Sequence, residues 1–178
     1  MFIRTDRLFL RPPFPEDWRD VYRGIANEST VRMLARAPWP YTQDDARDYC
    51  SRARSPGEMG YAIVLPTAPG GPVIGQVGIE RRADGGYECG YWIAEAYRGQ
   101  GYAVEALSAA LETARCLRVE RVEAGHFLDN PASGRVLRKC GFVPTVACAM
   151  TASAGRGGES APARRYAIDL AQDMPQAA

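Results

Sequence analysis

One glycine-containing turn, placed between a β-prone run and an amphipathic helix, constrains the fold of this chain more than any other sequence feature. The segment reads Glu88-Cys-Gly-Tyr-Trp-Ile-Ala-Glu-Ala-Tyr-Arg98-Gly99-Gln-Gly101-Tyr-Ala103. Its later glycines and the final alanine let the backbone curl until several N–H groups point into one concavity. Such a nest at a helix N-terminus binds phosphate oxygens, and Arg98 adds a positive charge beside it. The alternative is a tight turn that only joins a strand to a helix.

Three other glycine motifs do not fit this segment. A P-loop needs Lys-Ser or Lys-Thr after its last glycine, and the chain contains neither dipeptide. A dinucleotide-binding G-x-G-x-x-G/A fingerprint would require glycine or alanine where Val104 stands. A nucleophile elbow needs G-x-S-x-G, which does not occur in the chain. The turn therefore predicts a phosphate site of another type.

Four segments carry apolar residues at the i, i+3, i+4 spacing of a helix with one buried face. The first repeats this spacing at Trp18, Val21, Tyr22 and Ile25. Polar capping residues and glycine mark the ends of the others. The first predicted helix begins at Pro15, and the second follows the N-cap Thr42. The third spans residues 102–117, and the fourth runs between the N-cap Asn130 and the C-terminal stop Gly141.

The intervals between these helices are rich in β-branched and aromatic residues and predict strands. The Asp84–Gly85 dipeptide between two such runs predicts a β-hairpin. Residues 153–163 are small and polar and predict a flexible loop. We therefore expect one α/β (α+β) domain over residues 1–178, with antiparallel hairpins at its centre. The predicted strands are 7–11, 61–65, 73–81, 87–94, 121–128, 142–151 and 165–170.

Composition excludes several function classes. The chain of 178 residues has 22 basic and 21 acidic side chains, so a general affinity for nucleic acid or for anionic membranes is not expected. The five cysteines include no C-x-x-C pair and His126 is the one histidine, so no metal site is predicted. A charged N-terminus without a long apolar core predicts no signal peptide, and no apolar run is long enough to span a bilayer. A cytoplasmic location is the expectation.

The spacing that fits the turn is [Gln/Arg]-x-x-Gly-x-[Gly/Ala], met by Arg98, Gly101 and Ala103. Here the sequence resembles the GCN5-related N-acetyltransferase (GNAT) superfamily, and the branch with the ribosomal-protein alanine N-acetyltransferases in particular. Three more blocks match in order, so that the resemblance covers about residues 3–142. They are the N-terminal IRTDRLFLRPPFPEDW, ECGYWI followed after the turn by EAL, and NPASGRVLRKCGF from Asn130.

The resemblance implies a mixed, mostly antiparallel central sheet with one splayed strand pair, flanked by about four helices. It implies that acetyl-CoA binds between the strand ending at Ala94 and the one ending near Leu128. The pyrophosphate would lie on the turn and on the first residues of the following helix, and strand amides with Asn130 would contact the pantetheine arm. The implied binding residues are Trp92, Ile93, Ala94, Arg98, Gly99, Gly101, Tyr102, Ala103 and Asn130. For Asn130, an N-cap role alone is the alternative.

Glu88 is the first candidate for the general base, because a carboxylate inside an otherwise apolar strand must be solvated by a cleft or paired. A salt-bridged or rim carboxylate is the alternative, and Glu80 is a weaker candidate base. The resemblance implies Ser133 as the residue that assists the leaving thiolate, since Leu137 stands where many members have a tyrosine. A helix serine that bonds backbone is the alternative. Some members of the branch have a catalytic glutamate in the stretch corresponding to 143–153, which is free of acids here.

The expected reaction is transfer of an acetyl group from acetyl-CoA to a primary amine of a protein N-terminus or a small molecule. A non-catalytic CoA-binding regulatory module is the alternative. Near-neutral charge does not favour a polycationic acceptor, although Glu80, Glu88 and Glu95 could attract one. Trp39 and Tyr41 are candidates for the acceptor pocket, and His126 is interpreted as a structural strand residue. A homodimer is possible.

Overall fold

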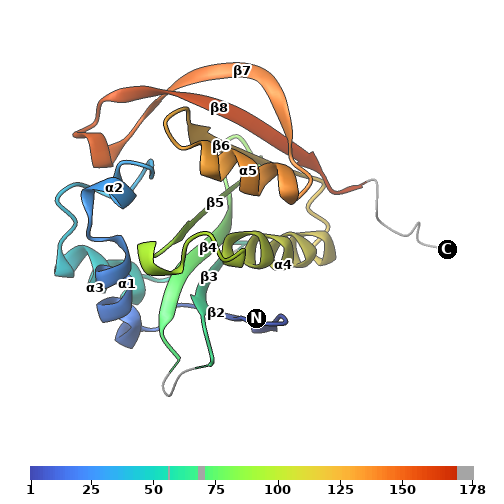
Figure 1. Ribbon diagram of the computed structural model, residues 1–178. Coiled ribbons are helices and arrows are strands. Elements are labelled where there is room, and N and C mark those ends of the chain that lie inside the picture. Colours follow the sequence, from blue (N-terminus) through green and yellow to red (C-terminus); the bar gives the residue numbers. More distant parts are fainter. Residues whose placement is uncertain (56, 68–70, 172–178) are drawn as a thin grey trace.

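One eight-stranded sheet forms the centre of the protein (Figure 1). The structure is a computed structural model that describes residues 1–55, 57–67 and 71–171. The strand order is β1-β2-β3-β4-β5-β6-β8-β7, and every neighbouring pair is antiparallel except β5–β6, which confirms the mixed, mostly antiparallel sheet. The strands are β1 (Ile3–Arg4), β2 (Phe9–Arg11), β3 (Met59–Val64), β4 (Val73–Arg81), β5 (Tyr87–Ile93), β6 (Arg121–Phe127), β7 (Val143–Ala152) and β8 (Ser160–Asp169).

The four predicted helices are all present. Thr42 and Asp45 form the capping box that begins α3, and the Asn130 side chain accepts a hydrogen bond from Ser133 N at the start of α5. The described residues also contain α2, which was not predicted because its four residues are too few to show a helical period. The α-helices are α1 (Trp18–Ile25), α2 (Glu28–Val31), α3 (Gln43–Ser51), α4 (Tyr102–Cys116) and α5 (Pro131–Lys139).

Helices pack on both faces of the sheet, because successive side chains of a strand point to opposite sides. On one face, Leu107 and Leu111 of α4 and Leu137 of α5 pack against strand residues such as Cys89. On the other face, α1, α2 and α3 cover residues that include Trp92. In Figure 1, α4 and α5 lie together while α1 to α3 form a separate group. The cavity described below reaches both faces.

The strands β5 and β6 pair only at their beginnings. Tyr87 is paired with Val122 and Glu88 with Glu123, and no later pair follows although both strands continue for several residues. The two strands therefore diverge toward Ile93 and Phe127, which confirms the predicted splayed pair. At the opposite end of β5, Arg82 N donates to Gly86 O at 2.7 Å and closes the predicted hairpin.

The prediction that residues 153–163 form a flexible loop is wrong in its second half. Strand β8 begins at Ser160, and only a turn with the short 3-10 helix η3 (Ala154–Arg156) precedes it. Residues 160–163 lack the β-branched and aromatic residues that predict a strand. They become one because they pair with β7, from Ala152↔Ser160 onward, and Ala163 also pairs with Phe127 of β6. Tertiary pairing overrides local preference here.

The turn between β7 and β8 docks on the segment that follows α2. Ser153 Oγ donates to Leu34 O at 2.7 Å, and Ala154 N donates to Ala35 O at 2.9 Å. We call this contact between residues 153–156 and 31–36 the bridge. In Figure 1 the turn of β7 and β8 reaches over α2. The bridge holds in place one wall of the cavity described next.

Candidate active site

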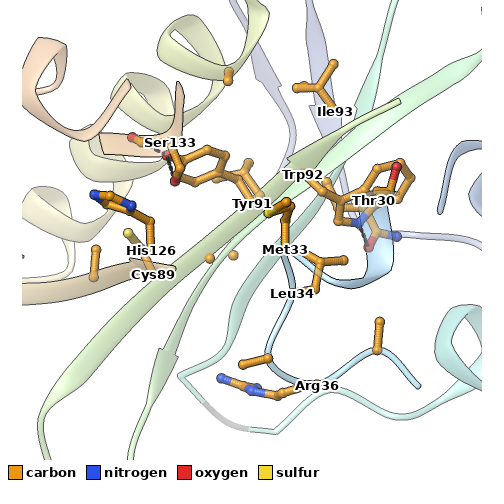
Figure 2. Close-up of a pocket in the computed structure, with 18 of the residues that line it drawn as sticks. Thr30, Met33, Leu34, Arg36, Cys89, Tyr91, Trp92, Ile93, His126 and Ser133 are labelled. Atoms are coloured by element: carbon orange, nitrogen blue, oxygen red, sulfur yellow. Dashed lines mark hydrogen bonds between the residues drawn. The ribbon is translucent and has the colours of Figure 1, made fainter. Parts of the chain in front are cut away.

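A cavity of about 1180 Å³ joins the glycine turn to the opening between β5 and β6. Its lining includes Gly99 and Gly101 of the turn, Ser133 of α5 and Met33 of the segment after α2. Figure 2 shows the side chains around β5, with Ser133 and His126 on one side and Met33, Leu34 and Arg36 on the other. The predicted phosphate site and the predicted catalytic residues therefore line the same cavity.

The backbone N–H groups of residues 99–103 meet no hydrogen-bond acceptor within the described part of the chain. Gly99 has φ +76° and Gly101 φ +86°, so both adopt the left-handed conformation that favours glycine. Gly101 is the N-cap of α4, and the first intrahelical bonds run from Val104 N and Glu105 N back to its carbonyl. This cradle of five successive amides at a helix N-terminus fits a pyrophosphate.

Arg7 and Glu105 brace the cradle from the outer side. Arg7 Nη1 donates to Gln100 O at 2.9 Å, and Arg7 Nε donates to Glu105 Oε2 at 2.7 Å. Thr5 Oγ1 donates to Glu105 Oε1 at 2.6 Å. These contacts join the loop before β2 to α4, about a hundred positions apart. They were not predicted, because nothing local in the sequence pairs the two segments.

The Arg98 side chain does not extend into the cradle. Its Nε donates to Ile93 O at 3.0 Å, and its Nη2 donates to Thr30 Oγ1 at 2.7 Å. Both acceptors are uncharged, and Arg98 also lines the cavity, so its positive charge beside the nest stays a prediction. The end of β5 diverges from β6, so the Ile93 carbonyl lacks a strand partner and the guanidinium supplies one. Arg98 thereby joins the end of β5 to α2.

The three strand residues predicted to contact the pantetheine arm differ in where their backbone groups point. Ala94 N donates to Ile74 O at 2.8 Å. A Cβ on Gly75 would lie 2.3 Å from Trp92 O, so that carbonyl also points at β4. Since the carbonyl and the next N–H of a trans peptide point in opposite directions, the N–H of Ile93 is directed toward the opening. Of this predicted set, Ile93 N–H is the group best placed for a ligand between β5 and β6.

Asn130 and Ser133 lie where predicted, at the first turn of α5, and both line the cavity. The Asn130 Oδ1 accepts from Ser133 N at 3.2 Å. Its Nδ2 has no acceptor among the residues that the structure describes, so it is able to donate to a ligand while Oδ1 caps the helix. The N-cap role and the binding role are therefore compatible.

Tyr91 is a site residue that the sequence did not indicate. Its hydroxyl lies 2.7 Å from Ser133 Oγ and donates to Ser133 O at 3.0 Å, as the dashed lines in Figure 2 show. Strand alternation put Tyr91 on the face opposite Glu88, and the helical pattern put Ser133 at the start of α5. Neither pattern fixes the distance between β5 and α5, so their contact could not be predicted.

Glu88 lies at the point where β5 and β6 diverge, and it is ion-paired. Its Oε1 is 2.6 Å from Arg165 Nη1 of β8, and Arg165 Nη2 is 3.5 Å from Glu123 Oε2 of β6. Glu80, the weaker candidate, is ion-paired with Arg36. Both carboxylates are therefore ion-paired, and both also line the cavity. By strand alternation Glu88 is on the face of β5 opposite Tyr91 and Ser133, so the predicted catalytic residues approach the opening from its two sides.

Other candidate residues are divided between the cavity and the core. Tyr41 lines the cavity, whereas Trp39 is 41% exposed and is not part of the lining. Leu137 is fully buried, so its position in α5 faces the core rather than the cavity. His126 lines the cavity and packs against α5. Its Nδ1 lies 2.8 Å from Phe127 O and its Nε2 3.4 Å from Tyr166 Oη, contacts expected of a structural strand residue.

Cys89 also lines the cavity. Burial raises the pKa of its thiol, so it stays protonated and is a poor nucleophile at neutral pH. Within the described ranges, no three His, Cys, Asp or Glu side chains gather closely enough to hold a metal ion. None of the helices in these ranges is long and apolar enough to cross a membrane.

Comparison with known proteins identifies the family of the chain. The sequence pattern of the acetyltransferase (GNAT) domain matches residues 7–143, so the chain belongs to the GNAT family of acetyltransferases. No curated protein matches the chain.

Several solved structures share its fold. An acetyltransferase of the GNAT family from Bacillus anthracis is 23% identical, with a TM-score of 0.81 over 96% of this chain and 99% of that one. The spermidine N-acetyltransferase from Vibrio cholerae, in complex with CoA and spermine, is 18% identical with a TM-score of 0.75 over 93% and 97%. The ribosomal-protein-S5-alanine acetyltransferase from Vibrio fischeri is 15% identical with a TM-score of 0.74 over 98% and 100%.

Proposed function

We propose that this protein transfers the acetyl group of acetyl-CoA to a primary amine by direct attack of the amine on the thioester. The observation that carries the proposal is the cradle at residues 99–103, whose five amides meet no acceptor among the described residues. All of the cradle except Gln100 lines the cavity between β5 and β6. The cradle would hold the pyrophosphate of acetyl-CoA, and Ile93 N–H and Asn130 would hold its pantetheine arm. Structural neighbours of the same family were solved with acetyl-CoA or CoA.

The chemistry needs alignment and proton transfer more than covalent catalysis. An amine nitrogen must lose a proton before it attacks, since an α-amino group titrates near 7.7–8.0 and a lysine amine near 10.4. Glu88 is the proposed base, directly or through water, and its ion pair with Arg165 positions the carboxylate at the opening. As the N–C bond forms and the C–S bond breaks, the electron pair of the latter stays on sulfur. Ser133 is the proposed hydrogen-bond donor to that thiolate.

The charge pattern of the cavity bears on the acceptor. Glu80 and Glu88 line the cavity and are both paired with arginine. Glu95 lies outside the lining and accepts a hydrogen bond from Asn27 Nδ2 at 3.0 Å. Asp45 and Asp48 of α3 also line the cavity, and neither has an arginine partner among the described residues. The segment after α2 adds the apolar side chains of Met33 and Leu34 to the lining. We propose an acceptor with a primary amine, either a protein N-terminus or a small molecule.

A panel assay of thiol release tests the proposal. Acetyl-CoA is offered with peptides that begin with alanine or serine, with small monoamines and with spermidine, while thermal shift measures CoA binding separately. We expect stabilisation by CoA and thiol release with at least one monoamine or peptide. Stabilisation without release from any amine would favour the non-catalytic CoA-binding module. Absence of stabilisation would refute the CoA site itself. The cytoplasmic location and the homodimer stay predictions.

A further inference from the structure

The Tyr91–Ser133 contact joins two elements across the opening in which the thioester is proposed to react. Tyr91 belongs to β5 and lies beyond Glu88, the last residue that pairs with β6. Ser133 lies in the first turn of α5, and its backbone N–H is already bonded to Asn130. The tyrosine hydroxyl contacts both the side chain and the carbonyl of Ser133. The serine is therefore fixed from two directions.

The hydroxyl protons allow two arrangements of this pair. Each hydroxyl carries one proton and accepts others. If Tyr91 donates to Ser133 O, the Ser133 hydroxyl donates its hydrogen bond to the Tyr91 oxygen. If Tyr91 donates to Ser133 Oγ, the Ser133 proton is free to point into the cavity. A negative charge that develops in the cavity favours the second arrangement, because hydrogen bonds to charged acceptors are the stronger ones.

Tyr91 is unsuited to give up its own proton. Burial raises the pKa of its hydroxyl, and the hydrogen bond with Ser133 only partly opposes this. A thiol has an ordinary pKa near 8.5, so a thiolate is too weak a base to take a proton from such a tyrosine. The hydroxyl of Tyr91 therefore acts through Ser133 and keeps its proton throughout.

We propose that Tyr91 is a positioning residue that turns the Ser133 hydroxyl toward the sulfur of the leaving CoA. In the reaction, the electron pair of the broken C–S bond stays on sulfur, Ser133 donates a hydrogen bond to it, and both hydroxyl protons remain on their oxygens. This inference rests on the proposed function, in which Ser133 stabilises the thiolate, and it adds Tyr91 as the residue that supports Ser133. This role also explains why Tyr91, which carries a polar hydroxyl, is packed against the hydrophobic core beside α4 and α5.

Kinetics of a double-mutant cycle test the coupling. We expect Tyr91→Phe and Ser133→Ala each to lower kcat about tenfold, the loss of one hydrogen bond to a charged group, with KM for acetyl-CoA changed less than about threefold. The double variant should be no slower than Ser133→Ala. Independent effects, in which the two fold-changes multiply, would refute the inference. So would an unchanged kcat in Tyr91→Phe.

The bound CoA thiol offers a second measurement that does not need turnover. Thiolate absorbance in the ultraviolet gives the pKa of CoA bound to each variant. The pKa of the bound CoA thiol should be about one unit lower in wild type than in Tyr91→Phe, as expected for one hydrogen bond that favours the thiolate. The same pKa in both proteins would overturn the inference even if the enzyme is active. If CoA does not bind to wild type, the proposed function fails instead.

Tyr61→Phe is the matched control. Tyr61 is a buried tyrosine on β3 in the same hydrophobic core, outside the cavity lining. Its substitution removes a buried hydroxyl with a comparable structural effect. We expect kcat and the pKa of the bound thiol to stay as in wild type. A loss of kcat in Tyr61→Phe equal to that in Tyr91→Phe would assign the effect to core packing.

Discussion

The guanidinium of Arg165 on β8 lies 2.6 Å from the carboxylate of Glu88 on β5. Glu88 is opposite Glu123 of β6 in the last residue pair before the two strands diverge, and Arg165 also reaches Glu123. Two carboxylates from neighbouring strands therefore share one cation at the start of the opening. This arrangement sets the position of the proposed base relative to the splayed strands.

Replacing Glu88 with Gln should lower kcat by about 10²–10⁴, the usual contribution of a general base. The amide keeps the shape of the side chain, so CoA binding should change little. The measurement is kcat as a function of pH, with Glu80→Gln as the control, since Glu80 pairs with Glu88 across β4 and β5 and has its own arginine partner. Unchanged kinetics in Glu88→Gln would reject the base assignment, and a larger loss in Glu80→Gln would transfer it.

Gly101→Ala should weaken CoA binding by about tenfold or more. Alanine is strained at φ +86° by about 1–2 kcal/mol, and relief of this strain would reorient the cradle amides. Gly57→Ala is a matched control, because Gly57 has φ +83° but is not part of the cavity lining. Calorimetric titration with CoA should give lower affinity for Gly101→Ala and wild-type affinity for Gly57→Ala. Equal affinities in all three proteins would contradict the cradle.

Glu105 should make the stability depend on acidic pH. Burial alone would raise the pKa of this carboxyl, but hydrogen bonds from Thr5 and Arg7 outweigh burial and lower the pKa below its ordinary value. A carboxyl with a lower pKa in the folded state stabilises the fold above its unfolded pKa of about 4.3, and this stabilisation is lost as the pH falls through the folded pKa.

Thermal unfolding from neutral to acidic pH tests this expectation. Wild type should be more stable than Glu105→Gln at pH 7, and the difference should shrink as the pH falls below about 4.3. Glu112→Gln, at an exposed position of the same helix, should change the free energy of unfolding by less than about 0.5 kcal/mol. A difference between wild type and Glu105→Gln that does not vary with pH would contradict the role of the carboxylate charge.

Gly155→Ala should destabilise the bridge. A Cβ on Gly155 would lie 2.4 Å from the carbonyl oxygen of Val31, so backbone must move to admit it. We expect a loss of about 1–3 kcal/mol in the free energy of unfolding, measured by urea denaturation. Gly90→Ala is the stability control, since a Cβ there would meet nothing within 4 Å. Similar stability of the two variants would mean that the bridge is loosely packed.

Features with a local physical cause were predicted well. The caps at Thr42 and Asn130 depend on a side-chain oxygen within three residues of the amide that it accepts from. The hairpin at Asp84–Gly85 depends on a glycine with positive φ, and Gly85 has φ +86°. The glycine turn before α4 belongs to the same class, since its curl follows from Gly99 and Gly101 themselves. Each of these features needs only neighbouring residues.

Features that depend on distant partners were missed. Strand β8 extends back to Ser160 because β7 pairs with it from there, and β6 joins the pairing at Ala163. Arg98 matched the family pattern, yet its guanidinium donates hydrogen bonds to Ile93 O and Thr30 Oγ1. The spacing of residues in a motif cannot show such partners. The contact of Tyr91 with Ser133 spans 42 positions and depends on how far β5 and β6 diverge.

By itself, the sequence determined the order of the longer helices and strands, the amide cradle, and the membership of the GNAT family that its motifs indicate. These follow from residue types at short separations, where backbone geometry leaves few choices. Only the tertiary structure decided which charges neutralise one another, which hydroxyl supports Ser133, and which wall the bridge holds in place. Those relationships depend on distances between elements, and side-chain packing across the whole sheet sets such distances.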